Sequence, residues 1–163
     1  MVVLDDADLD VAVGSAVNGA SFSTGQRCTA SSRLIVTEGI HDRFVGAMVD
    51  KIKSLKIDDA LEAGTDIGPV VDESQLAQDM KYLEIGQSEG AKLAFGGERL
   101  NRSKEGFYLQ PALFTETSND MRINREEIFG PVATVIRVKD YDEALAVAND
   151  TQFGCRPASA RPR

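Results

Sequence analysis

The chain has 163 residues, enough for one domain, with 42% hydrophobic and 27% charged residues, as in ordinary globular proteins. Its net charge of −8 argues against nucleic acid or an anionic membrane as a partner. No apolar run of about 18 residues and no signal-peptide layout is present, so we expect neither membrane insertion nor export. The two cysteines form no disulfide framework, which favours a reducing, cytoplasmic compartment.

The first half of the chain alternates short β segments with amphipathic helices. Residues 1–4 form an apolar strand, and a helix follows that Asp6 or Asp8 caps, with apolar residues at helical spacing up to Ala20. Residues 33–37 read as a buried strand closed by Glu38 and Gly39. The next helix is predicted to begin near Asp42. An irregular segment covers 58–72, and a third helix covers about 73–89.

The second half continues the alternation. Residues 92–95 are a strand, and the pair Gly96-Gly97 turns it back rather than cradling a phosphate, because no P-loop lysine follows. Residues 107–114 are extended with a bend at Pro111, residues 133–138 form a strand, and residues 141–149 form the last helix. This order predicts an α/β fold with a largely parallel, open sheet and flanking helices.

Metal binding is not expected, since neither cysteine has ligand spacing and the chain has a single histidine. That histidine, His41, lies at the predicted start of a helix. We therefore interpret it as a surface residue rather than a catalytic base.

One cysteine stands in a run of small, polar and hydroxyl residues, Phe22-Ser23-Thr24-Gly25-Gln26-Arg27-Cys28-Thr29-Ala30-Ser31-Ser32-Arg33. A buried structural cysteine usually has apolar neighbours. Here Arg27 supplies a cation beside Cys28, and a nearby cation favours the nucleophilic thiolate. The run is compatible with a reactive thiol, although a lone cysteine is more often structural.

Much later in the chain comes Glu127-Ile128-Phe129-Gly130-Pro131-Val132. Together with Gly25-Gln26-Arg27-Cys28, this motif resembles the aldehyde dehydrogenase superfamily. Between the two motifs, short segments with glycine, aromatic residues and proline follow in the family's order. These segments are Gly90-Ala91-Lys92, Gly96-Gly97, Gly106-Phe107-Tyr108 and Pro111. The resemblance covers about residues 1–154.

The resemblance assigns roles to individual residues. Cys28 matches the family's catalytic nucleophile, which forms a thioester, and its backbone N–H matches half of the oxyanion hole. Glu127 matches the carboxylate that binds the ribose of the nicotinamide cofactor, NAD or NADP, and Phe129 matches the ring packed near it. In extended backbone, neighbouring side chains point to opposite faces. We therefore expect Glu127 to enter the site and Glu126 to be solvated or paired elsewhere.

Arg27 has three possible roles. The run around Cys28 looks closest to α-ketoglutaric semialdehyde (2,5-dioxovalerate) dehydrogenases, whose substrates carry a distal carboxylate. A guanidinium binds carboxylates bidentately, so Arg27 is a candidate substrate contact. Alternatively, it tunes the thiol or forms an outward-facing salt bridge.

The resemblance also implies what lies outside this chain. We interpret residues 1–154 as part of the catalytic (thiol) domain of an aldehyde dehydrogenase. The family's NAD(P)-binding domain, general-base glutamate and oxyanion-hole asparagine would precede it. Residues 155–163 are a non-family tail that we expect to be disordered. If its Cys-Arg-Pro-Ala-Ser is encoded by TGT-CGT-CCG-GCA-TC(N), one added C in front gives Leu-Ser-Ser-Gly-Ile, as the family's continuation would read. We therefore hypothesise that the tail is frameshifted and that Cys155 has no function.

The expected partner is a small-molecule aldehyde, with no nucleic acid and no membrane. Full-length family members are homo-oligomers. Lacking a cofactor domain, the chain alone is expected to turn over little or not at all. Two alternatives stay open: a cofactor-independent thiol esterase and a non-catalytic product that associates with partner subunits.

Overall fold

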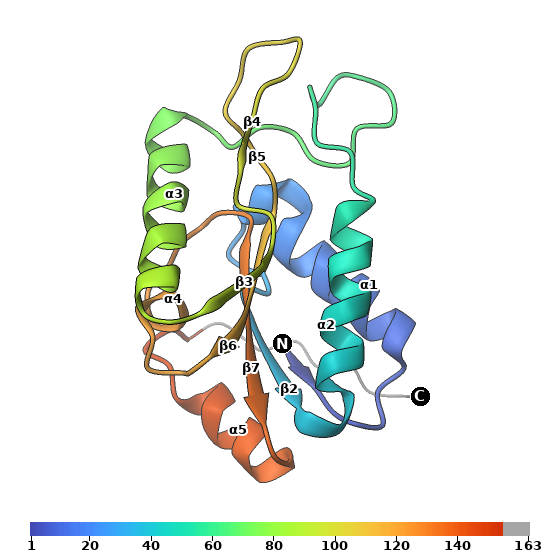
Figure 1. Cartoon of the computed structure of the whole chain (residues 1–163), viewed down its shortest axis with the longest axis vertical. Coiled ribbons are helices and arrows are strands. Elements are labelled where there is room, and N and C mark those ends of the chain that lie inside the picture. Colours follow the sequence, from blue (N-terminus) through green and yellow to red (C-terminus); the bar gives the residue numbers. More distant parts are fainter. Residues whose placement is uncertain (155–163) are drawn as a thin grey trace.

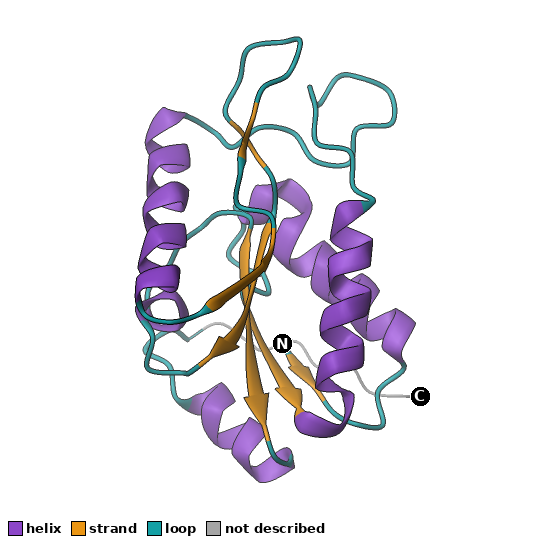
Figure 2. Ribbon diagram, in the orientation of Figure 1, coloured by secondary structure: helices purple, strands orange, loops and turns teal. Residues whose placement is uncertain are grey.

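The computed structural model describes residues 1–154 as an α/β unit built on a five-stranded sheet in the order β1-β2-β7-β6-β3 (Figures 1 and 2). Neighbouring strands are parallel except at β3, which runs antiparallel to β6. The predicted largely parallel open sheet is therefore confirmed. The strands are β1 (Val2–Val3), β2 (Arg33–Thr37), β3 (Lys92–Phe95), β6 (Ala112–Thr117) and β7 (Val132–Val138).

Helices cover both faces of the sheet (Figure 1). Side chains alternate along the central strands, so Leu34 and Val36 pack with α1 and α2, whereas Ile35 packs with α5. Phe114 of β6 packs with α3 on the same side as α5. The helices are α1 (Leu9–Ser21), α2 (Glu38–Lys53), α3 (Glu73–Ser88), α4 (Arg122–Arg125) and α5 (Tyr141–Asn149).

Three helices are capped by the aspartate that precedes them, whose carboxylate accepts a hydrogen bond from a free N–H of the first turn. Asp8 accepts from Val11 N at 3.1 Å in α1. Asp72 and Asp140 do the same for α3 and α5, each at 2.9 Å. The expectation that Asp6 or Asp8 caps the first helix is therefore confirmed at Asp8.

The prediction that the second helix begins near Asp42 is wrong, because α2 begins at Glu38. The cap comes from a residue far away in the sequence. The Asp5 carboxylate accepts hydrogen bonds from the Thr37 hydroxyl at 2.5 Å and from Ile40 N at 3.1 Å. A side chain at position 39 would contact that carboxylate, so Gly39 leaves it room.

The surface position predicted for His41 is also wrong. Because α2 begins early, His41 lies inside the helix, in line with Phe44 and Met48, and is 2% exposed. Its Nδ1 lies 2.8 Å from Asp42 Oδ1. His41 is thus a core residue remote from Cys28 in the fold, since it lies on a helix that contributes nothing to the cavity around that cysteine.

The prediction that Gly96-Gly97 turns the chain back is wrong. The chain runs on through the glycine pair and stays antiparallel to the same returning segment, since Gly97 N donates to Gln110 O and Gln110 N donates to Glu98 O. The reversal comes later, within residues 101–107. Gly96 and Gly97 both have positive φ, and a Cβ at Gly96 would collide with the Pro111 carbonyl. The chain then forms a two-stranded hairpin, β4 (Arg99–Leu100) with β5 (Tyr108–Leu109), before Pro111 bends it into β6. The hairpin projects beyond the main sheet (Figure 1).

Among residues 1–154, no helix is long and apolar enough to span a membrane. The expectations about the 155–163 tail and Cys155 fall outside the described residues.

Candidate active site

Two loops meet because they precede neighbouring parallel strands. The cysteine loop (residues 22–32) leads into β2, and the glutamate loop (residues 126–130) leads towards β7. Strands β2 and β7 pair in parallel, with Arg33 opposite Thr134, so both loops lie at the amino end of the sheet. A cavity of about 490 Å³ lies between them. All four predicted site residues line it: Arg27, Cys28, Glu127 and Phe129.

The cysteine loop takes a strained path after α1. Residues Phe22–Gly25 form a 3₁₀ turn in which Ser23, Thr24 and Gly25 have φ of 54°, 55° and 66°. Such values are costly for residues with a side chain and concentrate at functional sites. Backbone hydrogen bonds then close the loop, from Arg27 N to Gly25 O and from Ala30 N to Arg27 O, both at 3.0 Å.

This path leaves Cys28 as an exposed, free thiol at the tip of the loop. The Cys28 backbone N–H donates to no group within residues 1–154. A thiol and an unused backbone donor on one residue suit attack on a carbonyl carbon, because the N–H can receive the oxygen that becomes negative.

Arg27 is bound to helix α1. Its Nη2 donates to the Asn18 carbonyl and to Asn18 Oδ1, the latter at 3.0 Å. Within the described part of the chain it forms no ion pair, so the outward-facing salt bridge considered for it is absent there. Sequence reasoning missed Asn18, which carries no local signal of this contact.

The two adjacent glutamates of the glutamate loop differ in their surroundings. Glu126 is held by Arg122 Nε at 2.8 Å and by the Tyr82 hydroxyl at 2.8 Å. The Arg122 guanidinium, and after it the Tyr82 hydroxyl, keep the pKa of Glu126 below its ordinary value. Glu127 is exposed on the cavity, and its carboxylate has no partner among residues 1–154. Glu126 is therefore paired and Glu127 is free, but both glutamates line the cavity, so the expectation that only Glu127 enters the site is not met.

Phe129 is half-buried beside Glu127 and has φ of 60°, a conformation that an aromatic residue rarely adopts. Helix α3 holds the backbone next to it. Gln75 Nε2 and Gln78 Nε2 both donate to the Ile128 carbonyl, at 3.1 and 2.7 Å. The strain at Phe129 is thus balanced by contacts from a distant helix.

The α3 contacts come from one side of the helix. Gln78 and Asp79 follow Gln75 by three and four residues and precede Tyr82 by four and three, and all four face the glutamate loop. We call them the α3 stripe. Sequence reasoning missed the stripe, because polar residues on a helix normally indicate a solvated side.

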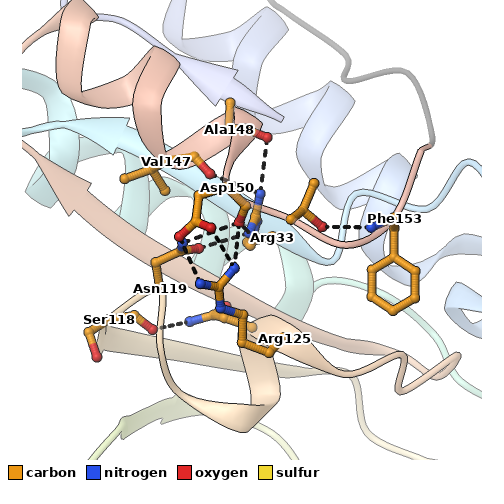
Figure 3. A network of polar contacts seen from close by, with 10 residues as sticks. Arg33, Ser118, Asn119, Arg125, Val147, Ala148, Asp150 and Phe153 are labelled. Atoms are coloured by element: carbon orange, nitrogen blue, oxygen red, sulfur yellow. Dashed lines mark hydrogen bonds and ion pairs between the residues drawn. The ribbon is translucent and has the colours of Figure 1, made fainter.

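A second network of polar contacts includes Arg33 and Ala148, which line the cavity (Figure 3). Arg125 donates to both carboxylate oxygens of Asp150, at 3.0 and 2.7 Å, and Asn119 donates to the same carboxylate. Arg33, which follows the cysteine loop, donates to the Val147 and Ala148 carbonyls at the end of α5. The network ties both loops to the segment that carries Phe153, which also lines the cavity.

Within the described residues, no group of three or more His, Cys, Asp or Glu side chains could hold a metal ion. The groups facing the cavity include a thiol, a free carboxylate and an aromatic ring. They fit an organic cofactor with hydroxyl groups.

The aldehyde dehydrogenase family model matches residues 1–158, so the chain belongs to the aldehyde dehydrogenase family, an NAD(P)-dependent oxidoreductase family. An α-ketoglutaric semialdehyde dehydrogenase of Bacillus subtilis is 44% identical over 94% of this chain and 32% of its own length. A betaine aldehyde dehydrogenase of Brucella anthropi is 42% identical over the same shares. The chain thus spans about a third of the length of these curated relatives.

Solved structures of aldehyde dehydrogenases match the fold of residues 1–154. Betaine aldehyde dehydrogenase from Staphylococcus aureus in complex with NAD⁺ superposes with a TM-score of 0.91 at 38% identity, over 94% of this chain and 31% of that one. The 1-pyrroline-5-carboxylate dehydrogenase from Thermus with bound NAD gives 0.88 at 42% identity, over 94% and 29%. Specific substrates differ among these relatives.

Proposed function

We propose that this chain supplies the nucleophile and the ribose-binding carboxylate of an enzyme that oxidises an aldehyde to a carboxylate with NAD or NADP. One observation carries the proposal: exposed Cys28 and the unpartnered Glu127 line the same cavity from two loops. Relatives named for α-ketoglutaric semialdehyde and betaine aldehyde support the substrate class.

Cys28 performs the covalent step. Its thiolate adds to the aldehyde carbon, forming a C–S bond and pushing the carbonyl electron pair onto oxygen. The free Cys28 N–H donates a hydrogen bond to that oxygen. After oxidation the acyl group is held on Cys28 as a thioester, and water cleaves the thioester to release the carboxylate.

Glu127 and Phe129 are the residues that fit the cofactor. The free Glu127 carboxylate has two acceptor oxygens for the vicinal hydroxyls of a ribose, and the half-buried Phe129 ring offers a face against which a flat ring packs. When bound, NAD or NADP accepts the two electrons that the substrate carbon loses. Asn18, the α3 stripe and Arg122 then act on the reaction only by positioning the two loops.

For the particular aldehyde we propose 2,5-dioxovalerate, with Arg27 as the contact for its distal carboxylate. The relative at 44% identity is an α-ketoglutaric semialdehyde dehydrogenase, which supports this choice. Arg27 lines the cavity, and only its Nη2 donates to Asn18, so donors on Nη1 remain for a ligand.

The test of the nucleophile uses this chain and p-nitrophenyl acetate, with intact-mass spectrometry to detect an acetyl thioester. We expect one acetyl group per chain, located on Cys28 and lost in Cys28→Ala. Cys155→Ser is the matched control and keeps the label, because it removes the other cysteine. Equal labelling of Cys28→Ala would remove the observation on which the proposal stands.

The test of the cofactor site measures NAD and NADP binding by saturation-transfer NMR. Glu127→Gln keeps the size of the side chain and removes its charge, and it is expected to weaken the ribose signals several-fold. Glu126→Gln is the control, because that carboxylate is already held by Arg122 and Tyr82. Equal binding by the two variants contradicts the role proposed for Glu127.

A further inference from the structure

Asp79 is a buried carboxyl group that the proposed chemistry does not use. It lies on α3 and is 0% exposed. Its Oδ1 accepts a hydrogen bond from Gln75 Nε2 at 2.8 Å, and its Oδ2 has no partner within residues 1–154. A buried carboxylate with an unpaired oxygen is costly, whereas the protonated form is tolerated far better.

This carboxyl group packs directly against the glutamate loop. A Cβ added at Gly130 would collide with Asp79 Oδ1, so only a glycine allows the two to approach so closely. On its other side, Gly130 meets the cysteine loop, because a Cβ at Gly25 would collide with the Gly130 carbonyl. Asp79, Gly130 and Gly25 therefore form a continuous stack from α3 through the glutamate loop to the cysteine loop.

Gln75 links the stack to the strained part of the glutamate loop. Its two amide protons are used at once, one on Asp79 Oδ1 and the other on the Ile128 carbonyl. Gln75 thus connects the Asp79 carboxyl to the residue immediately before Phe129.

No charged side chain compensates Asp79. Its pKa is raised to about 7 by burial, which the hydrogen bond from Gln75 only partly offsets, and no neighbouring charge contributes. The charged residues that the packed loops and α4 bring to this region are engaged elsewhere or face the cavity. They are Arg27 (bound to Asn18), Arg122 and Glu126 (paired with each other), Arg125 (bound to Asp150) and Glu127 (exposed on the cavity).

We infer that Asp79 is a positioning residue that, in its neutral form, holds Gly130 against Gly25 and so sets the spacing of the two loops across the cavity. When Asp79 loses its proton, a carboxylate that must be hydrated lies against Gly130. Neither Gly130 nor Gly25 has a side chain that would keep water out of this contact, so water enters between the loops. The loops then separate. The inference rests on the proposed function in one respect: the distance that Asp79 sets is the distance between Cys28 and Glu127.

Hydrogen exchange measured by NMR tests this on the full chain. The reporters are the Arg27 and Val132 amides, which donate to Gly25 O and Gly130 O at 3.0 and 2.8 Å. After correction for intrinsic exchange, we expect their protection to fall about tenfold as the pH rises through about 7. In Asp79→Asn, which mimics the neutral acid, protection stays constant. Glu84→Gln, an exposed change on the same helix, behaves as wild type.

A second measurement uses the wild-type chain, so it does not depend on a variant that folds. The ¹³C resonance of the Asp79 side-chain carboxyl in the wild-type chain must titrate with the same midpoint as the loss of protection. A pH step that persists in Asp79→Asn, a wild type without a step, or a carboxyl midpoint near its ordinary value would each overturn the inference.

Acetylation of Cys28 is scored on the same samples. Failure of acetylation with the pH step intact overturns the proposed function and leaves the role of Asp79 supported. Acetylation without the step overturns the role of Asp79 alone.

Discussion

The cysteine loop and the glutamate loop face the same cavity but are held in different ways. The cysteine loop is fixed mainly by backbone and by neighbours in sequence, as in the bonds from Ser31 N to Gly19 O and from Arg27 to Asn18. Two of its long-range bonds are donated by backbone N–H groups, from Val71 to Gln26 Oε1 and from Thr134 to Ser32 O. The glutamate loop is fixed by side chains of a helix about fifty residues earlier, through Gln75, Gln78 and Tyr82. Backbone changes should therefore break the first loop, and side-chain changes on α3 should break the second.

The largest effect is expected for Gly25→Ala in the cysteine loop. Gly25 has φ of 66°, and a Cβ there would collide with the backbone carbonyl of Gly130, which cannot shift as cheaply as the end of a flexible side chain. Backbone strain and overpacking together should lower the free energy of unfolding by about 3 kcal/mol or more. Urea unfolding measures the loss.

Gly14→Ala is the matched control for that change. Gly14 lies in α1 with nothing within 4 Å of an added Cβ, so alanine there should leave stability unchanged or raise it by about 0.5–1 kcal/mol. Equal losses for the two variants would contradict the close approach of the two loops.

The next effect concerns Gly130 in the glutamate loop, where the obstacle is a side chain. Gly130→Ala should cost about 2 kcal/mol, because the methyl group collides with Asp79. In an Asp79→Ala background the same change should cost less than half as much. The difference is a coupling energy, measured by a double-mutant cycle in urea.

Gly46→Ala in both backgrounds is the control for this cycle. Gly46 lies on α2 with open space around it, so its effect should not depend on residue 79. If the cost of Gly130→Ala is also independent of residue 79, the contact between Gly130 and Asp79 is not what excludes a side chain there.

The contrast between the loops also explains how much the sequence could predict. Cys28, Glu127 and Phe129 stand in contiguous motifs, and the strands 33–37 and 92–95 and the helix 141–149 were predicted with their observed bounds. In each case the signal is local: an apolar run, an aspartate cap or a motif. Such features are encoded within a few residues of where they act.

What the sequence did not predict depends on residues that meet only in the folded chain. Helix α2 begins at Glu38 because Asp5 caps it, and no residue near position 38 reports that. In the same way, the α3 stripe looks like an ordinary polar side until Ile128 and Glu126 are placed against it. The short helix α4, one turn long, has no periodic pattern to detect.

A smaller effect is expected when one donor of the α3 stripe is removed. Gln75→Ala takes away the hydrogen bonds to Asp79 Oδ1 and to the Ile128 carbonyl, and it leaves a buried carboxyl oxygen unsatisfied. The loss should be about 1–2 kcal/mol in urea unfolding. Gln87→Ala, an exposed change on the same helix, should cost less than about 0.5 kcal/mol. Equal losses would mean that the stripe does not hold the loop.

The smallest effect is expected for Tyr82→Phe, which removes only the hydroxyl that donates to Glu126, at a cost of about 0.5–1 kcal/mol. The pH dependence of this cost tests the contact more sharply than its magnitude does. The pKa of Glu126 is lowered in the fold by Arg122 first and Tyr82 second, so the associated stability is present above the ordinary glutamate pKa. This stability is lost as the pH falls through the lowered pKa.

The cost of Tyr82→Phe should therefore be full at neutral pH and should shrink in acid. Tyr141→Phe on α5, whose exposed hydroxyl has no partner within residues 1–154, should show neither a cost nor a pH dependence. A cost for Tyr82→Phe that is the same in acid would place its origin in packing rather than in the Glu126 carboxylate.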